Sequence, residues 1–354
     1  MRLLDLLHRW TGGIVGLVLA LLGLTGVVLI HKNVWIGVPH AGDPLLPGHA
    51  AIAAATERLL AQSGKAPEGI IYASDGFGLH QLRFAGGGGA YADQAGAIVS
   101  RWTGRWQRPE LWIFDLHHHL FAGEIGETVI GVSALCAIFF VVSGAILWWR
   151  TRRTFKPRLL PKRMSRSAIL MHHRDLGIMT APLLLLSALT GAMMIFKPVA
   201  AIVVAPFSPP AAVARAMAPP KLISGPLAAR PDWRWMIAAA QARFPDAEVR
   251  ILALPRKPGD AITLRMKRAA EWLPNGRTTL CFDAADGHLL SARDALAMPT
   301  GAQVYNAAYP LHAAKVGGLA YRLVMTCSGL AMTMLGGFAV WTFWFKRRRK
   351  MLPR

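Results

Sequence analysis

Four long apolar runs dominate the pattern of hydrophobic and polar positions in this chain. The runs cover residues 11–30, 128–149, 175–196 and 319–345. A helix needs roughly 20 residues to cross a hydrocarbon core about 30 Å thick, so each run predicts one membrane-spanning helix. Tryptophans near the ends of these runs, at Trp10, Trp149 and Trp344, are typical of the membrane interface.

The two long segments between these runs have a different pattern. Residues 49–62 and 232–244 have helical periodicity. Each is followed by an alternating, strand-like run, LHQLRF or AITLRMK, and then by a hairpin signal that starts at Tyr91 or Cys281. We therefore expect a small helix-plus-sheet domain in each segment.

Two stretches of biased composition interrupt these domains. Residues 198–231 are rich in alanine and proline, which predicts an extended linker or lid. The four consecutive glycines at 86–89 predict a flexible loop tip, and their spacing does not fit a phosphate-binding loop.

The composition favours an integral membrane protein and excludes several other classes. Hydrophobic residues make up 53% of the 354 residues, charged residues only 17%, and the mean hydropathy is +0.35. A disordered chain has fewer apolar residues, and a soluble nucleic-acid-binding protein does not carry long uncharged apolar runs. The three cysteines form no CxxC pair, so neither a disulfide framework nor a cysteine-based zinc or iron–sulfur site is expected.

The placement of lysine and arginine predicts the direction of the spans. The chain has 40 Lys and Arg against 19 Asp and Glu, and the short segments 1–9, 150–174 and 346–354 hold 2, 9 and 6 of the 40. By the positive-inside rule, these segments and both chain ends are cytoplasmic, and residues 32–127 and 197–318 lie outside, in a bacterial periplasm. The net charge of +21 then reflects topology and attraction to anionic lipid, and no nucleic-acid partner is required.

The chain also contains an internal repeat. The residues that match at an offset of 165 or 195 include His8 with His173, Arg9 with Arg174, Thr25 with Thr190, and His117 with His312. An apolar run near an N-terminus can also be a cleaved signal peptide, but this one has a counterpart in the second half. Two such halves predict a four-helix bundle with an internal two-fold repeat.

Most of the histidines cluster near the ends of the spans. These eight are His8, His31, His117, His118, His119, His172, His173 and His312. His8 and His31 are 23 residues apart, roughly 35 Å along a helix, so they lie near opposite membrane surfaces. The pair at 172–173 joins the inner layer, and the others join the outer layer. A lone histidine there is more often an interfacial residue, but a repeated set of ionisable residues at membrane depth points to function.

The two histidine layers favour a haem cofactor. Imidazoles from facing helices of a bundle can hold a metal cofactor, and imidazole suits iron, zinc and copper. Haem iron fits best because almost no carboxylate and no thiolate accompanies the inner layer. Glycines along the spans either admit a flat macrocycle or let the helices pack closely. Arg9, Arg174, Lys32 and Lys197 either pair with haem propionates or anchor the helices at the interface.

Six motifs carry a family resemblance over nearly the whole chain. They are LHRWTGG at 7–13, LTG at 24–26, DLHHHLFAGEIG at 115–126, MHHRDLG at 171–177, LTG at 189–191 and PLHAAKVGG at 310–318. The chain resembles the PepSY-associated transmembrane proteins and, among them, the FoxB-type ferric-siderophore reductases. This resemblance implies a cytochrome b-like inner-membrane protein with two PepSY-like periplasmic domains and two haem b groups, which reduces Fe(III) in a siderophore complex to Fe(II).

Position by position, the resemblance implies four haem ligands. They are His8 and His173 on the inner side, and His117 and His312 on the outer side. Three neighbours compete for these roles, namely His118, His119 and His172, and the role of His31 is open because it matches Phe196 in the other half. The implied substrate is a ferric siderophore. The electron donor is quinol or a cytoplasmic reductase, because the sequence has no dinucleotide- or flavin-binding fingerprint.

The spans and the resemblance together predict the organisation of the chain. We expect transmembrane helix 1 in residues 1–34, a PepSY-like domain in 35–110, transmembrane helix 2 in 111–152, a basic cytoplasmic loop in 153–170, transmembrane helix 3 in 171–198, a linker and second PepSY-like domain in 199–308, and transmembrane helix 4 with a basic tail in 309–354. The fold class is an all-α transmembrane bundle with two small α+β periplasmic domains.

Other interpretations stay open at this point. A PepSY-type membrane protein that restrains a peptidase would carry merely interfacial histidines. A metal transporter is a third possibility, although the spans lack the acidic residues usual in ion pathways. The outer tryptophans and arginines form either a receptor for an anionic chelate or the core and rim of the domains (Trp102, Arg105, Trp106, Arg108, Trp233, Arg234, Trp235).

Overall fold

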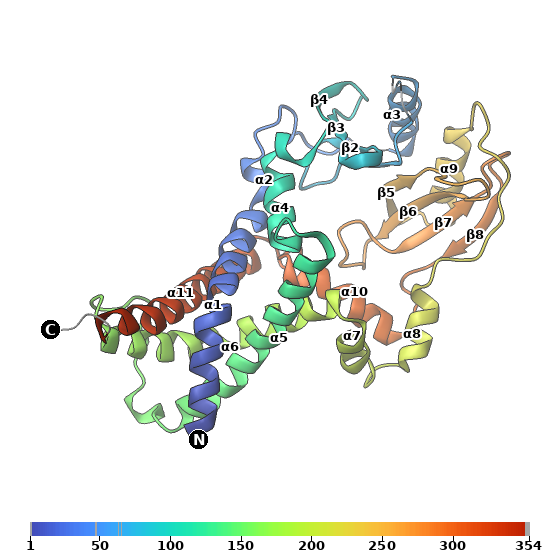
Figure 1. Ribbon diagram of the computed structural model, residues 1–354. Helices are drawn as coiled ribbons and strands as arrows, with labels where there is room; N and C mark the ends of the chain where they lie inside the picture. Colours follow the sequence, from blue (N-terminus) through green and yellow to red (C-terminus); the bar gives the residue numbers. More distant parts are fainter. Residues whose placement is uncertain (1, 47, 63, 65, 351–354) are drawn as a thin grey trace. The chain divides into compact units, whose positions relative to one another are not determined.

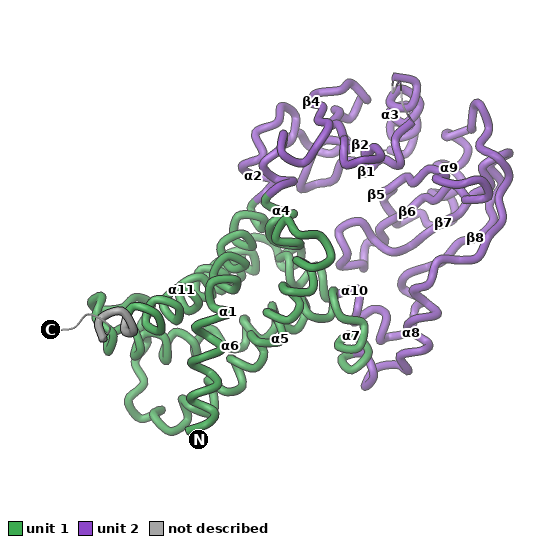
Figure 2. The backbone as a smooth tube through the Cα atoms, in the orientation of Figure 1, with its two compact units in different colours: residues 1–31, 113–203, 308–354 green, residues 32–112, 204–307 purple. Residues whose placement is uncertain are grey.

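The computed structural model describes residues 2–46, 48–62, 64 and 66–350, with side chains up to Phe345. The chain forms two compact units, each built from discontinuous segments (Figure 2). Unit 1 comprises residues 1–31, 113–203 and 308–354, and unit 2 comprises residues 32–112 and 204–307.

Unit 1 contains four helices that are long and apolar enough to cross a membrane (Figure 1). They are α1 (Arg2–Ile30), α5 (Gly123–Trp149), α6 (Arg166–Ile195) and α11 (Gly318–Lys350). The four predicted spans are therefore confirmed as helices. All four begin earlier than predicted: α1 at Arg2 instead of residue 11, α5 at Gly123 instead of 128, α6 at Arg166 instead of 175, and α11 at Gly318 instead of 319. As a result, His8, His172 and His173 lie within long helices.

The four helices form a closed bundle, because α1 packs on α5 and α11, and α6 packs on the same two helices. Glycines set the closest of these approaches. A Cβ atom on Gly16 would lie 2.9 Å from the carbonyl oxygen of Gly336, and one on Gly23 would lie 2.6 Å from that of Gly329. Part of the predicted glycine set therefore serves close packing of α1 on α11.

The chain also forms shorter helices in the segments that connect these elements. They are α2 (Lys32–Trp35), α4 (Pro109–His119), α7 (Lys197–Val204), α8 (Pro210–Met217) and α10 (Thr300–His312). The prediction of an extended segment over 198–231 is wrong for α7 and α8. Alanine and valine runs form these helices, and proline at the first position of α8 suits a helix start. Residues 218–231 are not helical.

Unit 2 is built on one antiparallel sheet with the strand order β4-β3-β2-β1-β5-β6-β7-β8. The strands are β1 (Gly69–Ile71), β2 (His80–Arg83), β3 (Gly89–Ala92), β4 (Ile98–Trp102), β5 (Ala247–Ala253), β6 (Ile262–Arg268), β7 (Thr278–Phe282) and β8 (Leu289–Arg293). The first strands of the two halves pair with each other, with Ile70 opposite Leu252. The two segments that the sequence predicted as separate domains therefore share a single sheet.

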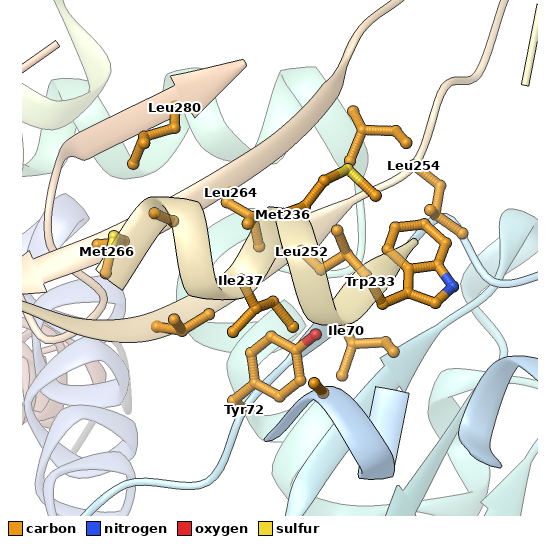
Figure 3. Packing of buried hydrophobic residues seen from close by; sticks show 14 of the residues in the cluster. Ile70, Tyr72, Trp233, Met236, Ile237, Leu252, Leu254, Leu264, Met266 and Leu280 are labelled. Carbon is orange, nitrogen blue, oxygen red and sulfur yellow. The ribbon is translucent and has the colours of Figure 1, made fainter. Parts of the chain in front are cut away.

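Helices α3 (His49–Gln62) and α9 (Trp233–Arg243) pack on each other, and both contribute to the main core of this unit. Figure 3 shows that core: Ile70 and Tyr72 from the first half lie with Met236, Ile237 and Leu252 from the second half. A core shared by both halves explains why neither half needs a large core of its own.

The outer aromatic residues divide between the two roles left open by the sequence. Trp102 and Trp233 are buried in hydrophobic clusters, whereas Trp106 and Trp235 are exposed.

The four consecutive glycines at 86–89 do not all lie in a loop. Gly86 has a positive φ in a tight turn, but Gly89 begins β3 against the ring of Trp102, where a Cβ would clash. Only the first glycines of the run match the predicted loop tip.

Candidate functional site

The first histidine pair lies inside the bundle of unit 1. The imidazoles of His8, on α1, and His173, on α6, face each other with their ring centroids 6.3 Å apart and their planes 87° apart. Phe140 on α5 contacts the His8 ring edge-on, with centroids 5.2 Å apart. Three different helices therefore hold this pair in place.

A hydroxyl group fixes the proton position on His8. Its Nδ1 lies 2.8 Å from Oγ of Ser143, and that hydroxyl donates its own hydrogen to the carbonyl oxygen of Phe139 at 2.6 Å. Since the Ser143 hydrogen is already used, Oγ accepts from the Nδ1–H of His8. The Nε2 of His8 then carries a free lone pair, which is the form of imidazole that binds a metal. For His173, the main chain at Leu335 supplies the hydrogen-bond partner.

The second pair repeats this arrangement with different elements. His117 at the end of α4 and His312 at the end of α10 have ring centroids 6.3 Å apart and planes at 58°. Nδ1 of His117 lies 2.8 Å from Oγ1 of Thr25, whose hydrogen goes to the carbonyl oxygen of Leu21. Nδ1 of His312 donates to the carbonyl oxygen of Ser187 at 3.0 Å, with Oγ1 of Thr190 at 3.3 Å. Both imidazoles therefore also keep Nε2 free.

Glycines hold the backbone close to three of these rings. A Cβ atom on Gly26 would lie 3.3 Å from Cε1 of His117, and one on Gly191 would lie 3.3 Å from Cε1 of His312. On the other pair, a Cβ on Gly144 would lie 3.5 Å from Cε1 of His8. The first two contacts are tighter than ordinary packing, so side chains at these glycines would displace the histidine rings.

A cavity of about 1420 Å³ lies within unit 1 beside the first pair. Typical small-molecule pockets enclose about 300–1,000 Å³, so this one has room for a large cofactor. His8 and His173 line it together with small residues from three helices, Gly12, Gly144 and Gly177. Five arginines also line it: Arg2, Arg9, Arg150, Arg166 and Arg174.

The arginines around the cavity are not equivalent. Arg174 uses its guanidinium inside the protein, because Nε donates to the buried Asp175 and both Nη atoms donate to Thr154. Arg9 forms a loose, exposed ion pair with Asp5 at 3.6 Å. In contrast, the Nε of Arg166 is buried and has no hydrogen-bond partner among the described residues. Arg9 and Arg174 were predicted from the sequence because they match each other in the internal repeat. Arg166 was missed because it has no matching arginine in the other half.

The competing histidines have other contacts. Nε2 of His172 donates to the carbonyl oxygen of Leu159 at 3.0 Å, and its ring packs on Phe338. Nε2 of His31 lies 2.9 Å from Oγ1 of Thr326, which donates its own hydrogen to Arg322. Both rings therefore carry hydrogen on Nε2, unlike those of His8, His117 and His312.

Two further candidates, His118 and His119, contact each other. Their nitrogens Nδ1 and Nε2 lie 3.2 Å apart, and the ring of His118 stacks on Phe114. The structure thus brings together the four histidines that the resemblance implied and gives separate partners to the other four.

The hydroxyl partners of the paired histidines were not identified from sequence, although a signal was available. Thr25 and Thr190 are the central residues of the two LTG motifs that match at an offset of 165. Each contacts an imidazole of the second pair. Ser143 has no such motif, and only the structure places it beside His8.

These features define a membrane protein with a four-helix bundle whose interior presents two facing pairs of imidazoles. The chain belongs to the family described as the PepSY-associated TM region, whose profile matches residues 6–347. A search of curated proteins returned no match to the sequence.

Proposed function

We propose that this protein is a di-haem b-type oxidoreductase of the bacterial inner membrane that reduces ferric siderophore on the periplasmic side and so releases iron. The observation that carries the proposal is the presence of two facing imidazole pairs, each with ring centroids 6.3 Å apart. Each member of a pair comes from a different helix.

The spacing of the pairs supports haem iron. Metal–imidazole bonds are about 2 Å long, and a ring nitrogen lies about 1 Å from its ring centroid, so two imidazoles on opposite sides of one iron have centroids about 6 Å apart. The donor set also agrees, because imidazole is a ligand of haem iron, and His8, His117 and His312 keep Nε2 free. No thiolate lies in either pair.

The inner site has the properties that a propionate-bearing macrocycle requires. The cavity beside His8 and His173 combines glycine-lined walls with arginines, and Arg166 has a buried, unpartnered Nε. A guanidinium pairs well with a carboxylate. We assign Arg166, together with Arg2 and Arg150, to the propionates, whereas Arg174 holds Asp175 and Thr154.

The proposed reaction balances as a one-electron reduction. Haem supplies a one-electron iron couple near each membrane surface. Quinol or a cytoplasmic reductase is the donor, and each quinol provides two electrons, enough for two ferric complexes. Each Fe(III) in a siderophore gains one electron and becomes Fe(II). The hard oxygen ligands of the siderophore hold Fe(II) much more weakly, so the metal is released.

The charge distribution supports the direction of this transfer. The basic segments 1–9, 150–174 and 346–354 predict a cytoplasmic side at which the His8–His173 pair lies. His117 and His312 then lie near the periplasmic side. Electrons would pass from the first pair to the second.

An anaerobic redox titration tests the proposed function. Dithionite-reduced protein in detergent should show a b-type spectrum, and one equivalent of ferric siderophore per haem should reoxidise it while a ferrous chelator captures Fe(II). A control with the iron-free siderophore should leave the protein reduced. A protein that stays reduced with the ferric complex would contradict the proposal. A wild-type protein without a haem spectrum would favour the peptidase-restraining alternative, in which the histidines are merely interfacial.

A further inference from the structure

The rings of two neighbouring histidines at the end of α4 contact each other. The ring centroids of His118 and His119 are 4.5 Å apart, and Nδ1 of the first lies 3.2 Å from Nε2 of the second. Consecutive residues on a helix do not normally face each other. Here the helix ends at His119, and the next two residues, Leu120 and Phe121, have the positive φ values 49° and 61°. Residues held in such conformations cluster at functional sites.

Asp115 sets the proton position on one of these rings. Its Oδ1 lies 3.1 Å from Nδ1 of His119, one helical turn away. The carboxylate only accepts, so Nδ1 of His119 carries the hydrogen and Nε2 presents its lone pair toward His118. A metal-binding imidazole usually donates its other ring N–H to a carboxylate in this way.

The distance between the two nitrogens suits a shared cation. Two imidazole nitrogens bound to one metal at about 2.1 Å lie about 3.0 Å apart at right angles and about 3.4 Å apart in a tetrahedron. The observed 3.2 Å falls between these values. In the metal-free protein, Nδ1 of His118 donates to Nε2 of His119, so His118 binds a cation through Nδ1 when its hydrogen is on Nε2 instead.

The site is accessible and lies next to a proposed haem ligand. The side chains of His119 and Asp115 are 31% and 16% exposed. His118 follows His117 in the chain and interacts electrostatically with both His117 and His312. Glu127 also lies close enough to interact with His118, which adds a negative charge near the two imidazoles.

We propose that His118 and His119 form a divalent-cation site, with Asp115 as the positioning residue behind His119, that receives the Fe²⁺ released by the reaction. The role as receiver of Fe²⁺ rests on the proposed function. Two imidazole ligands leave the remaining coordination positions to water, which suits a site that holds the product briefly. Imidazole is a suitable ligand for ferrous iron.

Another cluster of metal-ligating groups serves as an internal control. Asp283, Asp286 and His288 lie within 4.8 Å of one another. Their carboxylates accept hydrogen bonds from the main chain of the β7–β8 turn and from the His288 ring. These hydrogen bonds within the turn account for the cluster without a metal. The variant His288→Ala therefore reports any non-specific metal binding there.

Zinc titration of the full-length protein, with its haem in place and other metals removed, tests the site, because Zn²⁺ binds without electron transfer. Calorimetry should give one site per chain, and binding should weaken at least tenfold in His118→Ala and His119→Ala. Asp115→Asn should weaken zinc binding about 10–100-fold, as loss of the hydrogen-bond partner of a metal-binding histidine does elsewhere. The control variants His288→Ala and His49→Ala should bind like the wild type.

A second measurement tests whether this site receives the released Fe²⁺. After anaerobic reduction of one equivalent of ferric chelate and rapid desalting, the wild type should retain Fe²⁺, and His119→Ala should not. Zinc binding that is unchanged in all three site variants would overturn the site, as would binding lost in His288→Ala. Loss of a haem absorption band in His118→Ala would make that residue a haem ligand and would also overturn it. A wild type that takes up no haem but still binds zinc at this site would retain the cation site and refute the proposed function and the ferrous role.

Discussion

At the scale of single residues, the proton position on each imidazole separates the candidate ligands from their neighbours. His8, His117 and His312 have Nδ1 directed at an acceptor, namely Ser143, Thr25 and the carbonyl oxygen of Ser187, and keep Nε2 free. His31 and His172 have the opposite arrangement, with Nε2 already used. Spacing along the chain groups histidines into layers, but it contains no information about ring orientation. The distinction therefore depends on side chains contributed by other helices.

The acceptor hydroxyls give the first prediction. Replacement of Ser143 by alanine, or of Thr25 by valine, removes the acceptor that orients His8 or His117. We expect haem affinity to fall about 10–100-fold, because loss of the hydrogen-bond partner of a ligand histidine has this effect on metal sites. Haem occupancy after purification and rebinding of added haem measure this. Thr180→Val is the matched control, since Thr180 makes the same bond to the main chain, at Leu176; equal losses in the control would contradict the prediction.

His80 gives a prediction of pH dependence for unit 2. It is buried next to Tyr72 and accepts from the amide of Ala73 through Nδ1. Burial lowers the pKa of His80 to about 4, with smaller opposing effects from Gln94 and Asp93. Between pH 6.5 and 4 the unfolded chain binds a proton that the folded chain does not, so stability falls as the pH falls through this range.

The loss should reach on the order of 3 kcal/mol by pH 4, since each pKa unit corresponds to about 1.4 kcal/mol. Denaturant unfolding of the full-length protein in detergent, followed by tryptophan fluorescence at several pH values, measures it. The variant His80→Gln should lack this part of the pH dependence. The same slope in the variant would show that other groups cause it.

At the scale of elements, the sequence predicts which helices and hairpins form better than it predicts where each begins and ends. The four spans, α3, α9 and the two hairpins all form where periodicity and turn residues place them. Their ends differ, because polar residues such as Asp5 or Arg174 at a membrane surface do not interrupt a helix. The helices over 197–204 and 210–217 were missed because their prolines suggested an extended chain, yet one proline begins a helix.

The contact between α1 and α11 gives a prediction with an adjacent control. A Cβ atom on Gly336 would clash with the carbonyl oxygen of Gly16, whereas one on Gly337 meets nothing within 4 Å. We expect Gly336→Ala to lower stability by about 1–3 kcal/mol through overpacking and Gly337→Ala to leave it unchanged or slightly raised. Thermal unfolding of the two variants in the same detergent decides this. Equal stability of the two would mean that α1 and α11 do not approach so closely.

At the scale of the whole molecule, the internal two-fold repeat stays a prediction, but the contacts within each unit agree with it. The Thr25–His117 and Thr190–His312 contacts occupy matching positions in the two halves. The single eight-stranded sheet could not be predicted, because pairing of β1 with β5 depends on residues about 180 positions apart that have no distinctive pattern.

The shared core predicts that the two halves of unit 2 unfold together. Leu252 is fully buried between residues of both halves, and Leu252→Ala should cost about 2–5 kcal/mol. Hydrogen exchange monitored by mass spectrometry should show equal loss of protection in β2 and in β7. Loss confined to β7 would show that the halves are independent. The partly exposed Ile251, replaced by alanine, is the matched control.

Haem content per chain, measured together with the reduced-minus-oxidised spectrum, tests the central claim most directly. With ample haem during expression, the wild type should carry two haems. Each of the variants His8→Ala, His173→Ala, His117→Ala and His312→Ala should lose the haem of its own pair, whereas His31→Ala should keep both. A colourless wild-type protein, or four variants that all retain two haems, would contradict the assignment of these histidines as iron ligands.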